Sequence, residues 1–190
     1  MRHKLIAIGA STGGPGHIHK ILESLPSSFE PSIVIAQHIN HIFIDGVVDS
    51  LSQSCKIPIY AGCDGMEIAT NSAVLIKGPF VNEIRKYGDS LRLCVLGDIS
   101  EDYSPSIDKL FFSIAGLGNL SNVMGVILTG IGSDGAKGLL EMRRMGACTI
   151  AESESTSVVY GMPRAAIEIG AADNGDDLDK IIEKIIEFGR

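Results

Sequence analysis

Short apolar runs alternate with amphipathic segments along most of the chain, and this alternation limits the fold more than any other feature of the sequence. Residues 5–8 (LIAI), 32–36 (SIVIA) and 123–128 (VMGVIL) are apolar runs of the length of a buried strand. After each run, apolar side chains recur every three or four residues, as on one face of a helix. Alternating strands and helices favour a parallel sheet covered by helices. We therefore predict an α/β fold with a doubly wound, mostly parallel sheet.

The pattern changes between residues 57 and 96, where short apolar segments are separated by glycine, asparagine and proline. Further strands are predicted there at residues 58–60, 73–76 and 91–95. Gly88 and Asp89 have the chemistry of a tight turn between two strands. We therefore expect at least one antiparallel hairpin at this point.

Several helix boundaries follow from capping preferences. Ser104 followed by Pro105 predicts the N-cap and the first residue of a helix. Gly146 predicts the end of a later helix, because glycine is favoured just after a C-terminus. Helical spacing places Met145 of that helix, and Phe43 of an earlier one, among the side chains that face the core.

One domain comprising residues 1–190 is predicted, because no linker, repeat or low-complexity tract divides the chain. The 16 basic and 23 acidic side chains give a net charge of −7, which disfavours binding to the phosphate backbone of nucleic acids. No run approaches the roughly 20 apolar residues that span a bilayer, and the N-terminus lacks the full pattern of a signal peptide. We expect a soluble, cytoplasmic protein.

Metal and cofactor motifs are also missing from the sequence. The cysteines at positions 55, 63, 94 and 148 match neither a C-x-x-C pair nor a zinc quartet. The acidic stretch at residues 173–177 is interpreted as a solvated turn and not as a metal site. We expect a protein that needs neither a metal ion nor an organic cofactor.

A reactive side chain follows each of the three strongest strands: Ser11, His38 and Asp134. The carboxyl ends of parallel strands meet at one edge of a sheet, so these side chains are expected to lie on the same rim. Ser11 also occupies the centre of a G-x-S-x-G motif, which presents a nucleophile on a sharp strand-to-helix turn. Serine, histidine and aspartate together indicate acyl transfer.

Each of these residues has a simpler interpretation. Ser11 fits an ordinary turn or an anion-binding loop at a helix N-terminus. His38 fits a partly buried structural histidine. His41, which is predicted in a loop, is a weaker candidate for a base than His38. Asp134, or Ser133 beside it, fits the N-cap of the following helix. The residue types alone leave these alternatives open.

The arrangement of five motifs resembles the catalytic domain of the CheB-type chemotaxis protein-glutamate methylesterases. These motifs follow one another in order over almost the whole chain. They are residues 8–15 (IGASTGGP), 37–38 (QH), 105–111 (PSIDKLF), 125–136 (GVILTGIGSDGA) and 159–167 (VYGMPRAAI).

This resemblance implies hydrolysis of glutamate methyl esters on the cytoplasmic helices of chemoreceptors, with glutamine deamidation as a related activity. Ser11 would be the nucleophile, His38 the general base and Asp134 its partner. Thr12 would be a polar neighbour in the nucleophile loop. The backbone N–H of Ile131, where the family has methionine, would stabilise the oxyanion.

The sequence departs from the family's pattern at three points, and the first two concern residues that would line the substrate cleft. Residues 77–82 lack a histidine that family members often carry, and Tyr103–Ser104 stands where another histidine is common. The family's usual N-terminal receiver domain has no counterpart, which predicts an isolated catalytic fragment or a stand-alone domain, with a receiver acting in cis or in trans. Asp108 is a second candidate acid, to which we assign a structural role at a helix start.

Three other functions compete with methylesterase activity. One is a catalytically idle docking domain of the same fold that binds a receptor or signalling partner. Another is an esterase that acts on a different methylated protein. The last is an unrelated phosphate-binding α/β domain.

Overall fold

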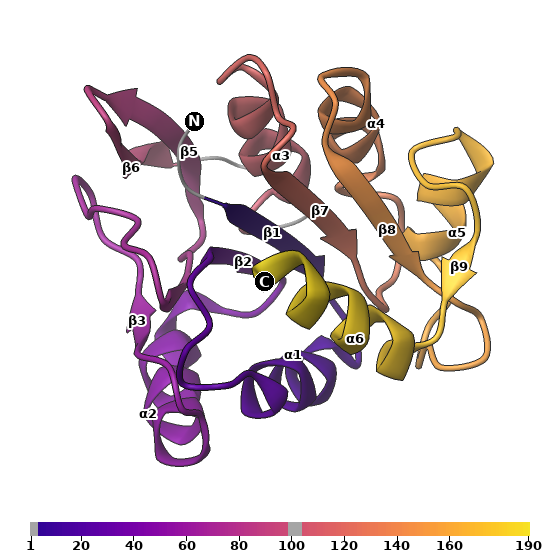
Figure 1. The fold of residues 1–190 in the computed structure, drawn as a ribbon, viewed down its shortest axis with the longest axis horizontal. Helices are drawn as coiled ribbons and strands as arrows, with labels where there is room; N and C mark the ends of the chain where they lie inside the picture. Colours follow the sequence, from indigo (N-terminus) through magenta and orange to yellow (C-terminus); the bar gives the residue numbers. More distant parts are fainter. Residues whose placement is uncertain (1–3, 99–103) are drawn as a thin grey trace.

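The protein is described by a computed structural model that covers residues 4–98 and 104–190. Its main sheet has seven strands, all parallel, in the order β3-β4-β2-β1-β7-β8-β9 (Figure 1). These strands are β1 Leu5–Ala10, β2 Ser32–Gln37, β3 Ile59–Ala61, β4 Ser72–Leu75, β7 Val123–Ile127, β8 Cys148–Glu152 and β9 Gly175–Asp176. The helices are α1 Gly14–Ser24, α2 Ile44–Ser54, α3 Ile107–Ala115, α4 Ala136–Arg144, α5 Met162–Glu168 and α6 Leu178–Gly189, with the 3₁₀ helix η1 at His41–Phe43.

Helices cover both faces of the sheet, which confirms the predicted doubly wound α/β fold (Figure 1). Ile6 and Ile8 of β1 pack in the cluster formed with α1, α2 and α6. Leu5 and Ala7 pack on the opposite face with α3, α4 and α5. Because neighbouring residues of a strand point to opposite faces, a strand covered on both sides must be apolar throughout. This explains the continuous apolar runs in the sequence.

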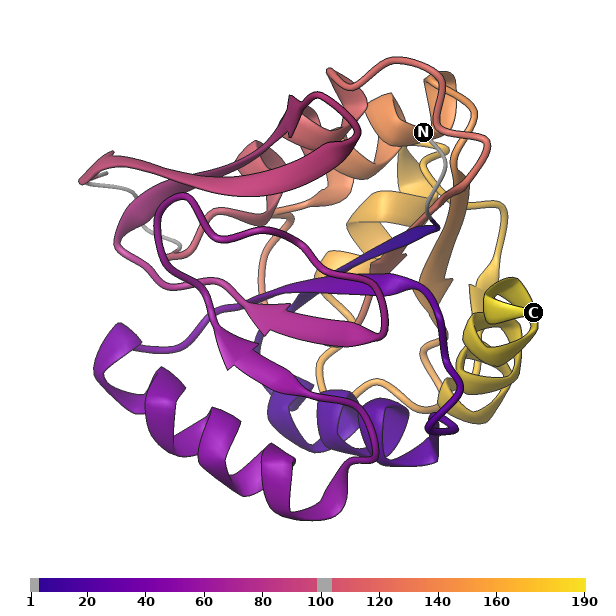
Figure 2. The ribbon, with the colours of Figure 1, turned by 60° about the vertical axis from the view of Figure 1, so that its left-hand side comes forward.

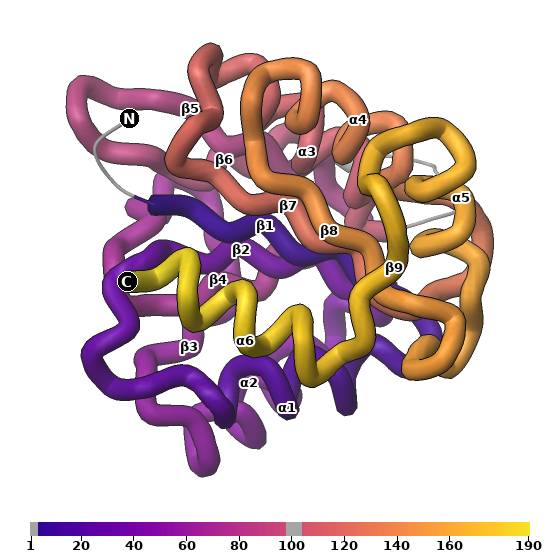
Figure 3. The backbone as a smooth tube through the Cα atoms, turned by 45° about the vertical axis from the view of Figure 1, so that its right-hand side comes forward, coloured from indigo at the N-terminus to yellow at the C-terminus, as the bar shows by residue number. Residues whose placement is uncertain are grey.

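The direction in which the chain adds strands reverses next to β1. After β1 the chain adds β2, β3 and β4 on one side, and it then returns to place β7 on the other. In open parallel sheets, the crevice outside the carboxyl ends of strands at such a reversal is the usual ligand site. Ala10 pairs with Gln37 of β2, and Gly9 with Ile127 of β7, so the three strands end at nearly the same level (Figure 3).

The predicted hairpin is confirmed as a separate antiparallel sheet of β5 Phe80–Tyr87 and β6 Ser90–Asp98. Its turn contains Gly88 at φ +61°, a conformation that glycine adopts without steric cost. The backbone N–H of Ile84 donates to Oγ of Ser113 in α3 (2.9 Å), so the hairpin lies on the α3 side of the molecule (Figure 2). The other strands predicted in this region join the parallel sheet as β3 and β4.

The start of α3 differs from the prediction. Its N-cap is Ser106, whose Oγ accepts an N–H from the first turn, and Pro105 precedes the cap. Ser104 and Ser106 offer the same capping chemistry, so local sequence does not distinguish them. A distant contact favours the later start, because the carboxylate of Asp134 accepts the N–H of Ile107.

Two predicted core side chains are exposed instead. Phe43 lies in η1 and is 57% exposed, whereas the next residue, Ile44, is buried. Met145 is 38% exposed at the end of α4, and Met142 takes the buried position. Gly146 follows that helix at φ +93°, as predicted for a residue just beyond a C-terminus.

Two glycines at the third position of a helix should respond oppositely to alanine. A Cβ on Gly138 of α4 would lie 2.6 Å from Cβ of Phe111 and 2.9 Å from the carbonyl oxygen of Asp108, so α3 and α4 would have to separate. We expect Gly138→Ala to destabilise the fold by about 1–3 kcal/mol. Gly16 of α1 is exposed with open space around it, so Gly16→Ala should stabilise by up to about 1 kcal/mol. Urea denaturation measures both, and equal effects would contradict the close helix approach.

Candidate active site

The ends of β1 and β2 bring Ser11 and His38 to neighbouring positions on the sheet rim. The backbone N–H of His38 donates to the carbonyl of Ala10, the last residue of β1, at 2.9 Å. Ser11 follows Ala10 directly, and its N–H donates to the carbonyl of Thr129 beyond β7 at 3.0 Å. Backbone hydrogen bonds between adjacent strands therefore determine how far apart the two residues lie.

Glycines allow the loop around Ser11 to turn sharply into α1. Gly13 has φ +86°, and a Cβ there would lie 2.6 Å from the side chain of Val158. The N–H of Gly14 donates back to the carbonyl of Ser11 at 2.8 Å. From the opposite side, a Cβ on Gly130 would lie 2.6 Å from Cβ of Ser11. Gly13 is needed for its positive φ and its approach to Val158, and Gly130 for its close approach to Ser11.

His38 and Asp134 form a direct hydrogen bond, with Nε2 of the histidine 2.8 Å from Oδ2 of the aspartate. An ionised carboxylate only accepts hydrogen bonds, so Nε2 carries the hydrogen and donates it. Both side chains are largely buried, at 9% and 8% exposure. The structure therefore brings Ser11, His38 and Asp134 to one rim, and their catalytic roles stay predictions.

Asp134 does not cap the helix that follows it. Gly135, in the left-handed region, precedes α4 without a side-chain cap. The Asp134 carboxylate turns instead to α3, where its oxygens accept the N–H groups of Ile107 (2.8 Å) and Asp108 (2.9 Å). Burial by itself would raise the pKa of Asp134, but the hydrogen bonds from His38 and these two N–H groups outweigh it. The pKa lies below its ordinary value, so Asp134 is ionised at neutral pH.

Asp108 has a structural role at a helix start, as predicted. It lies in the first turn of α3, but the helix whose start it supports is α4. Its Oδ1 accepts the N–H of Gly138 in the first turn of α4, at 2.7 Å. Burial raises the pKa of Asp108 more than the hydrogen bond from Gly138 lowers it, and the nearby charge of Asp134 raises it further. The two carboxylates thus hold α3 and α4 at their first turns, but their pKa values shift in opposite directions.

Thr129 holds the loop around Ser11 and Thr12 from the β7 side. Its hydroxyl donates to the carbonyl of Thr12 (2.8 Å) and accepts the N–H of Val159 (2.9 Å). Its own N–H donates to Glu152, a completely buried carboxylate at the end of β8 (2.9 Å). Nδ1 of His17 lies 3.2 Å from the same carboxylate oxygen. Neither Thr129 nor Glu152 was among the predicted site residues. The glutamate at the end of an apolar strand was the one sequence signal that could have indicated this contact.

The rim residues line an open cavity of about 640 Å³. Its lining is Ser11, Thr12, His38, Ile39, Asn40, His41, Pro79, Ser104 and Ile131. Thr12 and Ile131 therefore lie beside the serine, with Ile131 56% exposed. His41, the weaker candidate for a base, was predicted in a loop. It is the first residue of η1 and also lines this cavity. At the two positions where the family often has histidine, Pro79 and Ser104 line the cavity, and Tyr103 lies outside the described residues.

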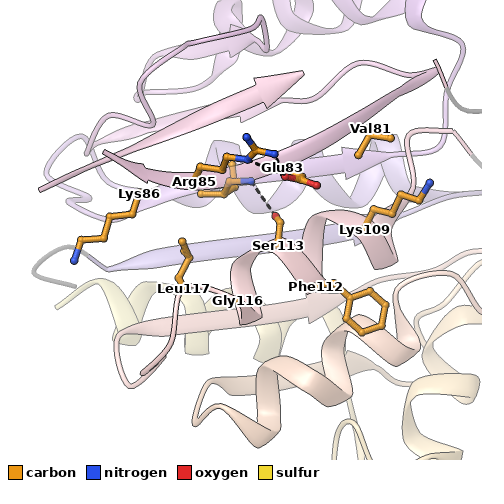
Figure 4. A pocket seen from close by; sticks show the side chains of 10 residues that line it. Val81, Glu83, Arg85, Lys86, Lys109, Phe112, Ser113, Gly116 and Leu117 are labelled. Atoms are coloured by element: carbon orange, nitrogen blue, oxygen red, sulfur yellow. Dashed lines mark hydrogen bonds and ion pairs between the residues drawn. The ribbon is translucent and has the colours of Figure 1, made fainter. Parts of the chain in front are cut away.

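A second cavity of similar volume, about 650 Å³, lies between β5 and α3, away from the strand ends (Figure 4). Its serine, Ser113, accepts the Ile84 N–H and donates to the carbonyl of Leu110. Arg85 pairs with Glu83 at 2.8 Å. Among the described residues that line it there is no histidine, so they do not offer the Ser-His-Asp chemistry of the first cavity.

Two further observations concern the described part of the chain. Within residues 4–98 and 104–190, no group of three or more His, Cys, Asp or Glu side chains is arranged to hold a metal ion. Among the helices of these residues, none has both the length and the apolar character needed to cross a bilayer.

The fold and this site define a doubly wound α/β protein with serine, histidine and aspartate at the carboxyl edge of its sheet. The chain belongs to the CheB methylesterase family, whose model matches residues 6–185. It is similar in structure to the CheB methylesterase catalytic domain of Thermotoga maritima, with a TM-score of 0.92 and 31% identity over 98% of this chain and 99% of that one. The resemblance inferred from the five motifs is confirmed.

Curated relatives carry a double name, protein-glutamate methylesterase/protein-glutamine glutaminase. One from Pseudomonas fluorescens is 39% identical over 98% of this chain and 55% of its own length. Another from Syntrophus aciditrophicus is 37% identical over 98% of this chain and 54% of its own length. The chain thus spans about half the length of these relatives.

The opposite pKa shifts of Asp134 and Asp108 should give opposite pH dependences of stability. The lowered pKa of Asp134 stabilises the fold above the unfolded value of about 3.9, and this contribution is lost as pH falls through the folded pKa. The raised pKa of Asp108 destabilises the fold as pH rises from the unfolded value through the folded one.

We therefore expect Asp134→Asn to be more destabilising at pH 7 than at about pH 3. Asp108→Asn, which keeps an acceptor oxygen for Gly138, should be better tolerated at pH 7 than at pH 3. Urea denaturation across this range tests both variants, and parallel pH profiles would contradict the assignment.

Proposed function

We propose that this chain hydrolyses glutamate γ-methyl esters on the cytoplasmic helices of chemoreceptors and releases methanol. The observation that carries the proposal is the buried His38–Asp134 hydrogen bond beside Ser11, at the strand reversal of the sheet. Serine, an imidazole and an ionised carboxylate in this relation are the parts of a nucleophilic hydrolase. Family membership and the names of the relatives support the methyl ester as the substrate.

The reaction begins when His38 accepts the hydroxyl proton of Ser11. Asp134 bonds Nε2, so the proton goes to the other ring nitrogen, Nδ1, and the ionised carboxylate stabilises the imidazolium. The alkoxide then attacks the ester carbonyl. The N–H of Ile131, which donates to no described residue, would stabilise the oxyanion as the tetrahedral intermediate forms. The side chain at position 131 does not enter this contact, so isoleucine serves as well as methionine.

His38 next returns the proton to the departing methoxide, and methanol leaves an acyl-enzyme on Ser11. Water enters the site, His38 takes its proton, and the hydroxide releases the glutamate carboxylate by the reverse path. The chain's own residues perform every proton transfer. The same acyl-enzyme forms from a glutamine amide with loss of ammonia, and the double name of the relatives supports this second activity.

Exposed apolar side chains beside the cavity support a protein substrate. Ile42 and Phe43 of η1 are 65% and 57% exposed, and Ile131 is 56% exposed in the cavity lining. Apolar surface around a site favours contact with another macromolecule. The described cysteines are all free thiols, which fits the reducing cytoplasm. A receiver domain would act on this site from elsewhere in a longer chain or from a separate protein.

Replacement of the proposed nucleophile provides the first test. Methanol release from methylated chemoreceptor fragments should be abolished in Ser11→Ala, because no hydroxyl remains to form the acyl-enzyme. Ser50→Ala, an exposed change on α2, is the matched control and should keep full activity. Thermal melts confirm that both variants are folded. Continued release by a folded Ser11→Ala variant would refute the mechanism, and no release by the wild type would favour the idle docking domain or another ester.

A second test separates the two aspartates. Asp134→Asn should lower turnover by about 10⁴, because the amide cannot stabilise the imidazolium and favours the wrong histidine tautomer. Asp108→Asn should retain most of the turnover, since its side chain contacts α4 and not His38. Turnover is measured by methanol release at saturating substrate. The reverse order of effects would assign the acid to Asp108.

A further inference from the structure

Gln37 connects the two reactive residues from inside the fold. It ends β2 and is only 4% exposed. Its Nε2 donates to the carbonyl of Ser11 at 2.9 Å and to the carbonyl of His38 at 3.1 Å. One side-chain amide therefore joins the loops that follow β1 and β2.

The chemistry of these contacts requires a donor at this position. Both partners are carbonyl oxygens, which only accept, and the amide must present its NH₂ group to them. The other end of the amide, Oε1, is buried and accepts no hydrogen bond from any residue that the structure describes. A buried acceptor without a partner is unfavourable for stability. An apolar side chain would avoid that cost but would take the donor away from both carbonyls, so the two donated hydrogen bonds are the reason for glutamine here.

The contact with Ser11 also determines the direction of the next N–H. A peptide unit is planar and trans, so the Ser11 carbonyl and the Thr12 N–H point in opposite directions. Gln37 and the N–H of Gly14 hold the Ser11 carbonyl toward the interior. The Thr12 N–H, which donates to no described residue, must then point away from them, and Thr12 lines the cavity.

We propose that Gln37 is a positioning residue, which aims the Thr12 N–H as a second oxyanion donor and holds the nucleophile and base loops in register. This inference rests on the proposed function for its catalytic meaning. It also explains Gly14, because a Cβ there would lie 2.1 Å from Oε1 of Gln37 and would expel the amide.

Three variants separate donation from simple space filling. Gln37→Met keeps the length of the side chain and removes the donor. Gln37→Glu keeps the shape but places an acceptor against two carbonyl oxygens, so it should be worse than methionine. Gln53→Met makes the same change at an exposed position of α2 and serves as the control. If Gln37 only fills space, the methionine variant should match the wild type.

The readout is the rate at which a fluorophosphonate probe labels Ser11, because the probe needs the nucleophile and the oxyanion donors but not the receptor. We expect labelling about 10- to 100-fold slower in Gln37→Met, slower still in Gln37→Glu, and unchanged in Gln53→Met. With a methyl ester substrate, kcat should fall more than KM rises, because the lost contact belongs to the transition state. Wild-type labelling by a folded Gln37→Met variant would overturn the inference.

Amide NMR of the same folded variants gives a readout that does not depend on activity. The Thr12 amide signal should shift in Gln37→Met, because the peptide unit that carries it is no longer held, whereas it should not change in Gln53→Met. An unchanged Thr12 signal in Gln37→Met would also overturn the inference. A wild type that is labelled at Ser11 but releases no methanol would refute the proposed substrate only. A wild type inert to the probe would refute the proposed hydrolase, and the Thr12 signal would still decide the role of Gln37.

Discussion

The carboxylate of Asp134 accepts hydrogen bonds from His38 and from the first turn of α3, and the geometry of the site depends on this one group. Its Oδ2 receives both Nε2 of His38 and the N–H of Ile107, while Oδ1 receives the N–H of Asp108. The positive end of the α3 dipole also favours negative charge there. The orientation of the imidazole therefore depends on where α3 lies on the sheet. A shift of that helix would be felt at the histidine without any change in the strands.

Asp134 and Asp108 show that burial alone does not determine the charge of a carboxylate. Each accepts backbone N–H groups at the start of a helix, and each is partly removed from water. Burial raises the pKa of both carboxyls. At Asp134 the hydrogen bonds from His38 and two backbone N–H groups outweigh burial, and the pKa falls; at Asp108 burial prevails over the hydrogen bond from Gly138, the charge of Asp134 adds to it, and the pKa rises. The residue that remains readily ionised is the one placed against the histidine.

The spacing of apolar residues and the positions of the strand ends were enough to predict the fold class. They also predicted that Ser11, His38 and Asp134 lie on one rim of the sheet. The strands are apolar throughout because both faces are covered, and parallel strands end together, so these conclusions need no distant contact. The start of α3 and the target of Asp134 were not predictable in this way. Local chemistry shows that a carboxylate can cap a helix, but Asp134 accepts N–H groups from a helix that begins 27 residues earlier in the chain. The role proposed for Gln37 was equally hidden, since it depends on the carbonyl of Ser11 in the loop that follows β1.

The pairing of Ala10 with Gln37 has a consequence for how the length of the chain can vary. Successive strand residues alternate between the two faces, so one residue inserted within Ser32–Gln37 would move side chains to the opposite face of the sheet and shift His38 away from Ser11. In the connection between α1 and β2, side chains do not alternate between the two faces of a sheet, so an added residue does not reverse them. Natural insertions and deletions between the serine and the histidine should therefore accumulate in that connection, and engineered tags or linkers should be tolerated there and nowhere inside the two strands.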